Sequence, residues 1–178
     1  MTAFMLSQII AFISFCSDLI AFYLPKRVYV LRTLAFSTLL LSGHFYLLEN
    51  YSAAAMMLLA CFRFLVATYS THHSLVYFFL IAALASCAIT WQGITDLFSL
   101  GGSLLLTCAA FQTNDYRLRL YTLGGCLFWI ANNIATGSPV AILMETTFFV
   151  STLISLIRIR RQAVGSLAYQ EWNKSSKP

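Results

Sequence analysis

The sequence predicts an all-α membrane protein with seven transmembrane helices, its N-terminus outside the membrane and its C-terminus inside. Of the 178 residues, 60% are hydrophobic and only 10% are charged, whereas a soluble domain carries about 25% charged residues. The mean hydropathy is +0.78, and the apolar residues form successive segments long enough to cross roughly 30 Å of hydrocarbon. The basic residues gather beside alternate turns. Together these features indicate a multi-pass protein whose main partner is the lipid bilayer.

The first three predicted spans cover residues 4–24, 28–48 and 52–69. Pro25 ends the first span because proline has no N–H group to continue a helix, and a polar turn at 49–51 separates the second span from the third. The first span has no basic residue before it and two directly after it, which is the reverse of a secretory signal peptide. We therefore expect it to stay attached as a membrane anchor.

The last four predicted spans cover residues 74–90, 94–111, 120–136 and 140–159. The turns between them contain glycine, proline or clustered polar residues, which favour loops over continued helices. Residues 1–161 would then be a single transmembrane domain. Beyond it, residues 162–178 are polar and are expected to form a short, poorly ordered cytoplasmic tail.

The positions of the basic residues predict the orientation independently of hydropathy, because lysine and arginine beside short loops stay on the cytoplasmic side. With seven spans, ten of the eleven basic residues share one face. Those near the membrane on that face are Lys26, Arg27, Arg32, Arg117, Arg119, Arg158, Arg160 and Arg161. Six spans would separate the later arginines from Lys26 across the membrane. Orientation thus explains the net charge of +5, and no nucleic-acid partner is expected.

Seven spans divide into three, one and three. The first triplet would cover about residues 4–69, the linker helix residues 74–90, and the second triplet about residues 94–159. Because each triplet has an odd number of crossings, the linker returns the second triplet in the same orientation, which produces parallel repeats. The strings "NYSAAAMMLLACF" and "TGSPVAILMETTF" resemble each other at a spacing of 86 residues, and Arg32 and Arg119, which lead the second and sixth spans, are 87 residues apart. We expect this 3+1+3 arrangement.

Four ionisable residues fall inside the spans, namely Asp18, His44, Arg63 and Glu145. Each costs about 2.5–3.5 kcal/mol on insertion scales, so each should face protein or water and have a partner. Asp18 and Arg63 are predicted about 9 and 10 Å from the cytoplasmic ends of their spans, which favours a pair in which Arg63 is a buried counter-charge or gate. Glu145 is the alternative partner, although its predicted depth differs by about 9 Å. Both pairings stay open.

Near the outer face, several polar residues are predicted at similar depth and could form a site. His44 and Glu145 lie about 6 and 8 Å from the outer ends of their spans, and Asn132 and Asn133 lie within roughly 6 Å. Trp129 is one helical turn before the two asparagines. Amides donate and accept hydrogen bonds, an indole stacks on rings, and an acid can hold a cation or a proton. This combination favours a small polar or ring-bearing solute.

Two functions follow from these residues, and the sequence leaves both open. The first is a carrier for a small polar solute. The alternative is a non-transporting membrane assembly or partner-binding protein, whose buried polar residues only fix helix packing. A homo-oligomer is compatible with both functions. We expect no enzyme, because GxSxG and HExxH are absent and carboxylates are few. The five cysteines are scattered singly, so no metal and no cofactor is expected.

Several long strings, including "GHFYLLENYSAAA" and "RLYTLGGCLFWIANNIATGS", resemble the small bacterial inner-membrane proteins of the YgjV type. The resemblance runs nearly end to end and implies a multi-pass protein of the bacterial inner membrane, without implying an activity. The residues that match the pattern of this family, position by position, are His44, Arg63, Arg119, Trp129, Asn133, Glu145 and Arg158. Asp18 is not part of the pattern, which favours Glu145 as the partner of Arg63. The three-one-three arrangement is similar to that of sugar-type and nicotinamide-riboside-type carriers, but the proline-glutamine signature of one such group is absent.

Overall fold

The computed structural model describes residues 2–21, 23–70, 72, 74–112 and 114–175, with the backbone alone for Arg27 and for residues 162–175. Within these residues the chain forms seven α-helices and no strand. The helices are α1 (Ala3–Ala21), α2 (Arg27–Leu47), α3 (Tyr51–Tyr69), α4 (Ser74–Ile89), α5 (Asp96–Ala110), α6 (Asp115–Thr136) and α7 (Pro139–Ser175). Each helix lies in the region expected for one of the seven spans, which confirms the all-α fold class.

Four of these helices are long and apolar enough to cross a membrane, namely Ala3–Ala21, Val28–Leu47, Tyr51–Tyr69 and Pro139–Arg161. The apolar helices α4 and α5 have only 16 and 15 residues, so they extend over about 24 and 22 Å at 1.5 Å per residue. Helix α6 has 22 residues, but its first turns carry Asp115, Arg117 and Arg119. Several membrane-spanning helices are therefore present, while the count of seven crossings stays a prediction.

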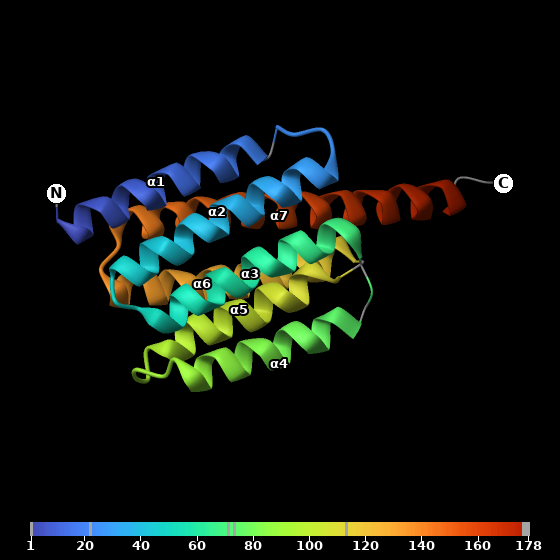
Figure 1. The fold of residues 1–178 in the computed structure, drawn as a ribbon. Helices are drawn as coiled ribbons and strands as arrows, with labels where there is room; N and C mark the ends of the chain where they lie inside the picture. Colours follow the sequence, from blue (N-terminus) through green and yellow to red (C-terminus); the bar gives the residue numbers. More distant parts are fainter. Residues whose placement is uncertain (1, 22, 71, 73, 113, 176–178) are drawn as a thin grey trace.

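Helix α7 is much longer than the last predicted span. It runs for 37 residues from Pro139 to Ser175, and Figure 1 shows it projecting beyond the other helices. The sequence favoured a poorly ordered tail from residue 162, whereas the structure continues the helix to residue 175. No proline interrupts this segment, so the polar composition that ends the membrane span does not by itself end the helix.

Neighbouring helices pack into two groups, the first bundle (α1, α2 and α3) and the second bundle (α5, α6 and α7). The bundles meet along two seams, where α3 packs on α5 and where α1 packs on α7. Helix α4 packs against α3 and α5 and lies at the edge of the molecule, while the start of α1 and the end of α7 lie at opposite ends (Figure 1). We call the end with the α2–α3 and α6–α7 turns the outer end, following the predicted orientation.

The α2–α3 and α6–α7 turns have the same backbone geometry. Glu49 and Gly137 both have left-handed φ angles, 59° and 70°. The N–H groups of Asn50 and Ser138 donate to carbonyl oxygens five residues earlier at 3.0 Å in both turns. The left-handed residues of the two turns are 88 residues apart, at 49 and 137. The spacing of 86 or 87 residues between the similar sequence strings stays a prediction.

Glycines bring α5 and α6 into close contact. A Cβ atom on Gly102 would lie 2.7 Å from Trp129 Nε1, and one on Gly101 would lie 2.7 Å from the Phe128 ring. A Cβ atom on Gly125 of α6 would lie 2.8 Å from Leu106 of α5. These three glycines are therefore used for close helix approach, as expected of small residues in membrane helices. The contact at Gly102 also fixes where the Trp129 indole lies.

Candidate functional site

A layer of buried side chains lies near the outer end, where the two bundles meet. The five residues expected to form a solute site are all buried: His44, Trp129, Asn132, Asn133 and Glu145. The first four are at most 1% exposed and Glu145 is 7% exposed. Phe45 packs on the Trp129 ring with a centroid distance of 5.7 Å. Side chains of α2 and α6 therefore meet within this layer, which we call the outer polar layer.

His44 connects three helices. Its Nδ1 atom lies 2.8 Å from the Ser7 carbonyl oxygen of α1, and its Nε2 atom lies 3.1 Å from the Ser138 hydroxyl beside α7. Because a carbonyl oxygen only accepts, Nδ1 carries a proton, and Nε2 of the neutral ring accepts from Ser138. The Ser138 hydroxyl also lies 3.3 Å from Gln8 Oε1. Its single proton cannot serve both acceptors, so a doubly protonated His44 would leave Ser138 free to donate to Gln8.

Asn50, in the α2–α3 turn, links the two bundles. Its Oδ1 atom accepts from the Ala53 N–H at 3.0 Å and caps α3. Its Nδ2 atom donates to Thr136 Oγ1 at 2.9 Å and to Asn132 Oδ1 at 3.3 Å. Asn50 is not among the site residues predicted from the sequence. Asparagine directly before an apolar helix is a helix-start signal, but its partners on α6 depend on the packing of the bundles.

Two glutamines hold each outer turn against the other bundle. Gln92, just before α5, accepts from one backbone N–H and donates to one backbone carbonyl of the α2–α3 turn, both at 2.9 Å. Gln8 of α1 accepts from the Val140 N–H at 3.3 Å and lies 3.3 Å from the Ser138 hydroxyl, beside the α6–α7 turn. The sequence carried no signal for either glutamine. Together with Asn50 and His44, they connect the bundles at the outer end.

Three buried polar atoms on α6 have no hydrogen-bond partner within the described chain, namely Trp129 Nε1, Asn132 Nδ2 and Asn133 Oδ1. The three residues lie on adjacent turns of one helix. Two of the atoms are donors and one is an acceptor. Leaving a buried polar group unpaired costs about 1–3 kcal/mol, so buried groups are normally paired. This stretch of α6 therefore has hydrogen-bonding capacity left over for a polar ligand or for water.

Glu145 and Asp18 lie in the α1–α7 seam, deeper in the molecule. Both are 7% exposed. The Glu145 carboxyl lies beside the Cys126 thiol, and the Asp18 carboxyl lies beside the Ser37 hydroxyl. The two carboxyls are close enough for the charge of one to act on the other. Among the described residues, no three His, Cys, Asp or Glu side chains are placed to hold a metal ion.

Arg63 lies in the other seam, and neither expected ion pair is formed. Its Nη1–H donates to the Thr107 hydroxyl of α5, and its guanidinium carbon lies 5.4 Å from the Phe64 ring centroid. Its Nε–H has no hydrogen-bond partner within the described chain. The reason is the helix arrangement, because α3 packs against α2, α4 and α5 rather than extensively against α1 or α7. Depth alone therefore could not identify the partner of Arg63.

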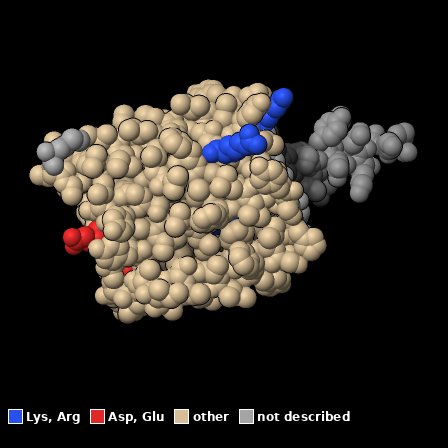
Figure 2. Space-filling model, viewed as in Figure 1, with Lys and Arg blue, Asp and Glu red and all other residues tan. Residues whose placement is uncertain are grey.

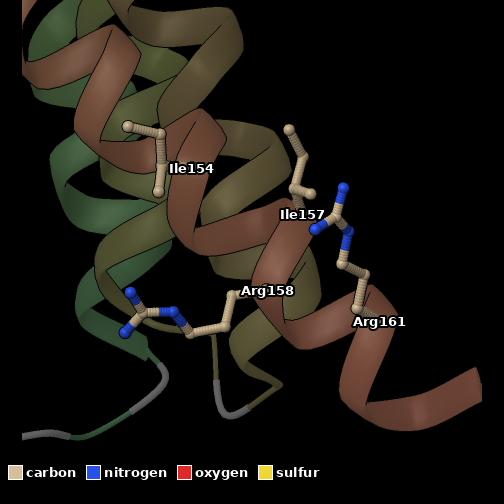
Figure 3. Close-up of a pocket in the computed structure, with 4 residues that line it drawn as sticks. All are labelled: Ile154, Ile157, Arg158 and Arg161. Carbon is tan, nitrogen blue, oxygen red and sulfur yellow. The ribbon is translucent and has the colours of Figure 1, made fainter. Parts of the chain in front are cut away.

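The basic residues expected on the cytoplasmic side lie away from the outer polar layer. Figure 2 shows basic side chains toward the end from which α7 projects and acidic ones toward the opposite end, separated by a wide uncharged surface. Arg158 and Arg161 line a surface pocket with Ile154 and Ile157, and their guanidinium groups extend in different directions, that of Arg161 beside Ile157 (Figure 3). The Nε atom of half-buried Arg119 has no hydrogen-bond partner within the described chain. The Arg27 side chain lies outside the described residues.

Comparison with known proteins places the chain by family. No curated protein and no solved structure matches it. A sequence model of the family Imp-YgjV, described as a bacterial inner membrane protein, matches residues 5–163. The matched region begins in α1 and ends in α7, so it includes both bundles, both seams and all residues of the outer polar layer.

Proposed function

We propose that this chain, which belongs to the Imp-YgjV family of bacterial inner membrane proteins, is a carrier that moves a small polar solute between its two bundles. The proposal rests on one observation above all, the three unpaired polar atoms of Trp129, Asn132 and Asn133. They belong to a stretch of α6 that contacts Asn50 and Phe45 of the first bundle, and carriers built from structural repeats bind their substrates where the repeats meet. His44 and Glu145 would complete the site from α2 and α7.

The arrangement of the helices supports a pair of parallel three-helix repeats. The α2–α3 and α6–α7 turns share one backbone geometry at a spacing of 88 residues, as from 49 to 137. Exchanging the two bundles also converts the α3–α5 seam into the α7–α1 seam, and both are observed contacts. In carriers of this kind, one repeat rocks against the other around a fixed site. The two seams would open and close as the bundles rock.

The hydrogen bonds of the outer polar layer support a state that is closed on the outer side. Asn50 to Thr136, His44 to Ser138, and the contacts of Gln8 and Gln92 all connect the bundles near the outer end. Each such bond contributes about 0.5–1.5 kcal/mol net. A few such bonds can keep the bundles together at the outer end. Solute binding that contributes a similar free energy can separate them. The solute would then enter from the inner side in this state.

The site residues have distinct roles in this proposal. Asn132 Nδ2 donates a hydrogen bond to the solute and Asn133 Oδ1 accepts one. The Trp129 indole presents an N–H donor and an apolar face, while Phe45 packs on its ring. These groups carry no charge, so they suit a solute with neighbouring donor and acceptor groups. Glu145 would hold a proton or cation at the membrane interior, where an ionisable residue usually marks an ion pathway.

A thermal-shift screen of purified protein against a library of small polar metabolites tests this site. At least one compound should stabilise the wild type, and Asn133→Ala should lose that shift because it removes the unpaired acceptor. Trp129→Phe should weaken the shift, since it keeps the ring but removes the N–H donor. Trp91→Phe is the matched control, because Trp91 is 52% exposed and outside the site. Stabilisation that is equal in all variants would count against a site on α6.

The alternative function is a membrane assembly protein whose polar residues only fix helix packing. It is favoured by one observation, the direct pairing of Asn50 with Thr136 and of His44 with Ser138, which needs no ligand. In that case Asn133→Ala should lower the amount of folded protein without changing the binding of any small molecule. A partner protein, or a second copy of this chain, should then co-purify with the wild type after mild solubilisation.

A further inference from the structure

We propose that Arg63 binds an anionic group, a carboxylate or a phosphate, in the inner half of the α3–α5 seam, and that this group belongs to the transported solute. This inference rests on the proposed carrier function and adds the charge of the substrate to it. The unpaired groups of Trp129, Asn132 and Asn133 are neutral, so they do not themselves require a charged solute. A charged solute is indicated instead by the Arg63 guanidinium, which has no role in the carrier mechanism above.

Arg63 is a buried charge without a counter-charge. Its side chain is 5% exposed, and its hydrogen bond in the described chain goes to a neutral group, the Thr107 hydroxyl. The Nε–H of the guanidinium is buried and has no partner within the described residues. Arginine stays charged in proteins, and a buried charge is normally paired with an ion or fully hydrogen-bonded. The guanidinium therefore has both charge and donors to offer to a ligand.

The carboxylates that could neutralise Arg63 lie in other parts of the structure. Asp18 and Glu145 lie together in the α1–α7 seam, beside Ser37 and Cys126. Asp96 of α5 accepts from the N–H groups of the turn before it, at 2.6 and 3.3 Å, and is eleven residues or about 16 Å along the helix from Thr107. Helix α4, which packs against both α3 and α5, contains no charged residue. The α1–α7 seam therefore contains acidic side chains, whereas the α3–α5 seam contains a basic one.

A second arginine lies at a similar depth beside the same helix. Arg63 is about 9 Å, and Arg119 about 6 Å, from the inner ends of α3 and α6 at 1.5 Å per residue. Both helices pack against α5, and the Nε atom of Arg119 is also buried without a partner in the described chain. Guanidinium groups match carboxylate and phosphate oxygens because their N–H donors form a planar fork.

The α3–α5 seam therefore suits an anion that enters from the inner side. Arg158 and Arg161 on α7 add positive charge at that end, which raises the local concentration of anions. The Thr107 hydroxyl holds the guanidinium in place and can turn its proton toward an incoming oxygen. The neutral part of the solute would then reach the outer polar layer when the bundles rearrange.

Thermal unfolding of the purified full-length protein in detergent tests this inference, with sodium acetate and sodium phosphate compared with sodium chloride at equal ionic strength. Acetate or phosphate should raise the midpoint of the wild type by about 3 °C or more, the size expected for a saturated site in a chain of this length. Arg63→Gln should abolish the shift. Arg63→Lys should retain only part of it, because an ammonium lacks the guanidinium fork. Arg160→Gln, which removes an exposed charge, should keep the full shift.

The controls separate folding from binding. If Arg63→Gln gives no folded protein on size exclusion, Arg63→Lys and Thr107→Val decide, and both should weaken the shift relative to Arg160→Gln. The inference is overturned if neither anion stabilises the wild type beyond chloride, or if the shift survives in the Arg63 variants. If the anion site fails this test but uptake still depends on Asn133, the proposed carrier function stands. If the shift depends on Arg63 but the protein takes up no solute, the anion site stands and the carrier function is refuted.

Discussion

The Asn50 amide donates a 2.9 Å hydrogen bond to the Thr136 hydroxyl, which lies 86 residues later in the chain and in the other bundle. The same side chain caps α3 through its Oδ1 atom. The start of α3 and the end of α6 are therefore held by one residue. Any motion that separates the bundles at the outer end must break this bond, so Asn50 couples helix capping to closure.

Substitution of Asn50 should separate these two roles. Asn50→Ala should destabilise the protein by about 1–3 kcal/mol, because it removes a helix cap and an interhelical hydrogen bond. Asn50→Asp keeps the capping oxygen but loses the donor to Thr136, so it should fall between alanine and the wild type. Thermal unfolding of the wild type and of both variants in the same detergent measures these differences in stability. If Asn50→Asp is as stable as the wild type, the link between the bundles contributes nothing.

The matched turns predict two changes of opposite sign. Glu49 is exposed and has a φ angle of 59°, a backbone conformation that costs a non-glycine residue roughly 1–2 kcal/mol. Glu49→Gly should therefore stabilise the protein by about 1 kcal/mol. Gly137 has a φ angle of 70° and open space around its Cβ position, so Gly137→Ala should destabilise by a similar amount through the backbone alone. Unfolding midpoints that move in the same direction would refute the shared turn geometry.

The close contact of α5 and α6 predicts a steric effect at Gly102. Gly102→Ala would place a Cβ atom 2.7 Å from Trp129 Nε1, and overpacking of this kind costs about 1–3 kcal/mol. Gly43→Ala in α2 is the control, because nothing lies within 4 Å of its Cβ position and alanine favours a helix by about 1 kcal/mol. Tryptophan fluorescence should change only in the first variant. Equal stability of both variants would contradict the packing of Trp129 on α5.

The predicted orientation can be tested by labelling single cysteines in a background that lacks the native ones. Trp91 and Ser70 are both exposed and lie at opposite ends of α4. With seven spans and the N-terminus outside, a membrane-impermeant maleimide added to spheroplasts should label Trp91→Cys and spare Ser70→Cys. The reverse pattern would place the basic residues outside the cell, against the charge rule on which the orientation rests.

The helices could be predicted from the sequence because hydropathy and basic turns act locally. The outer polar layer was also largely predictable, since the depths of His44, Asn132 and Asn133 follow from their distance to a turn. The partner of Arg63 was not, because depth says nothing about which side of a helix a residue occupies. Asn50, Gln8 and Gln92 were missed for a related reason, because their role depends on which turns meet across the bundles.

Uptake into proteoliposomes tests the central claim most directly. Vesicles containing the purified protein and protein-free vesicles are incubated with a mixture of small polar metabolites, and their contents are compared by mass spectrometry. The account predicts that at least one solute accumulates only with the protein, that Asn133→Ala lowers its initial rate about tenfold, equivalent to about 1.4 kcal/mol, and that Trp91→Phe does not. Identical contents in both kinds of vesicle, with folded protein in the membrane, would contradict it.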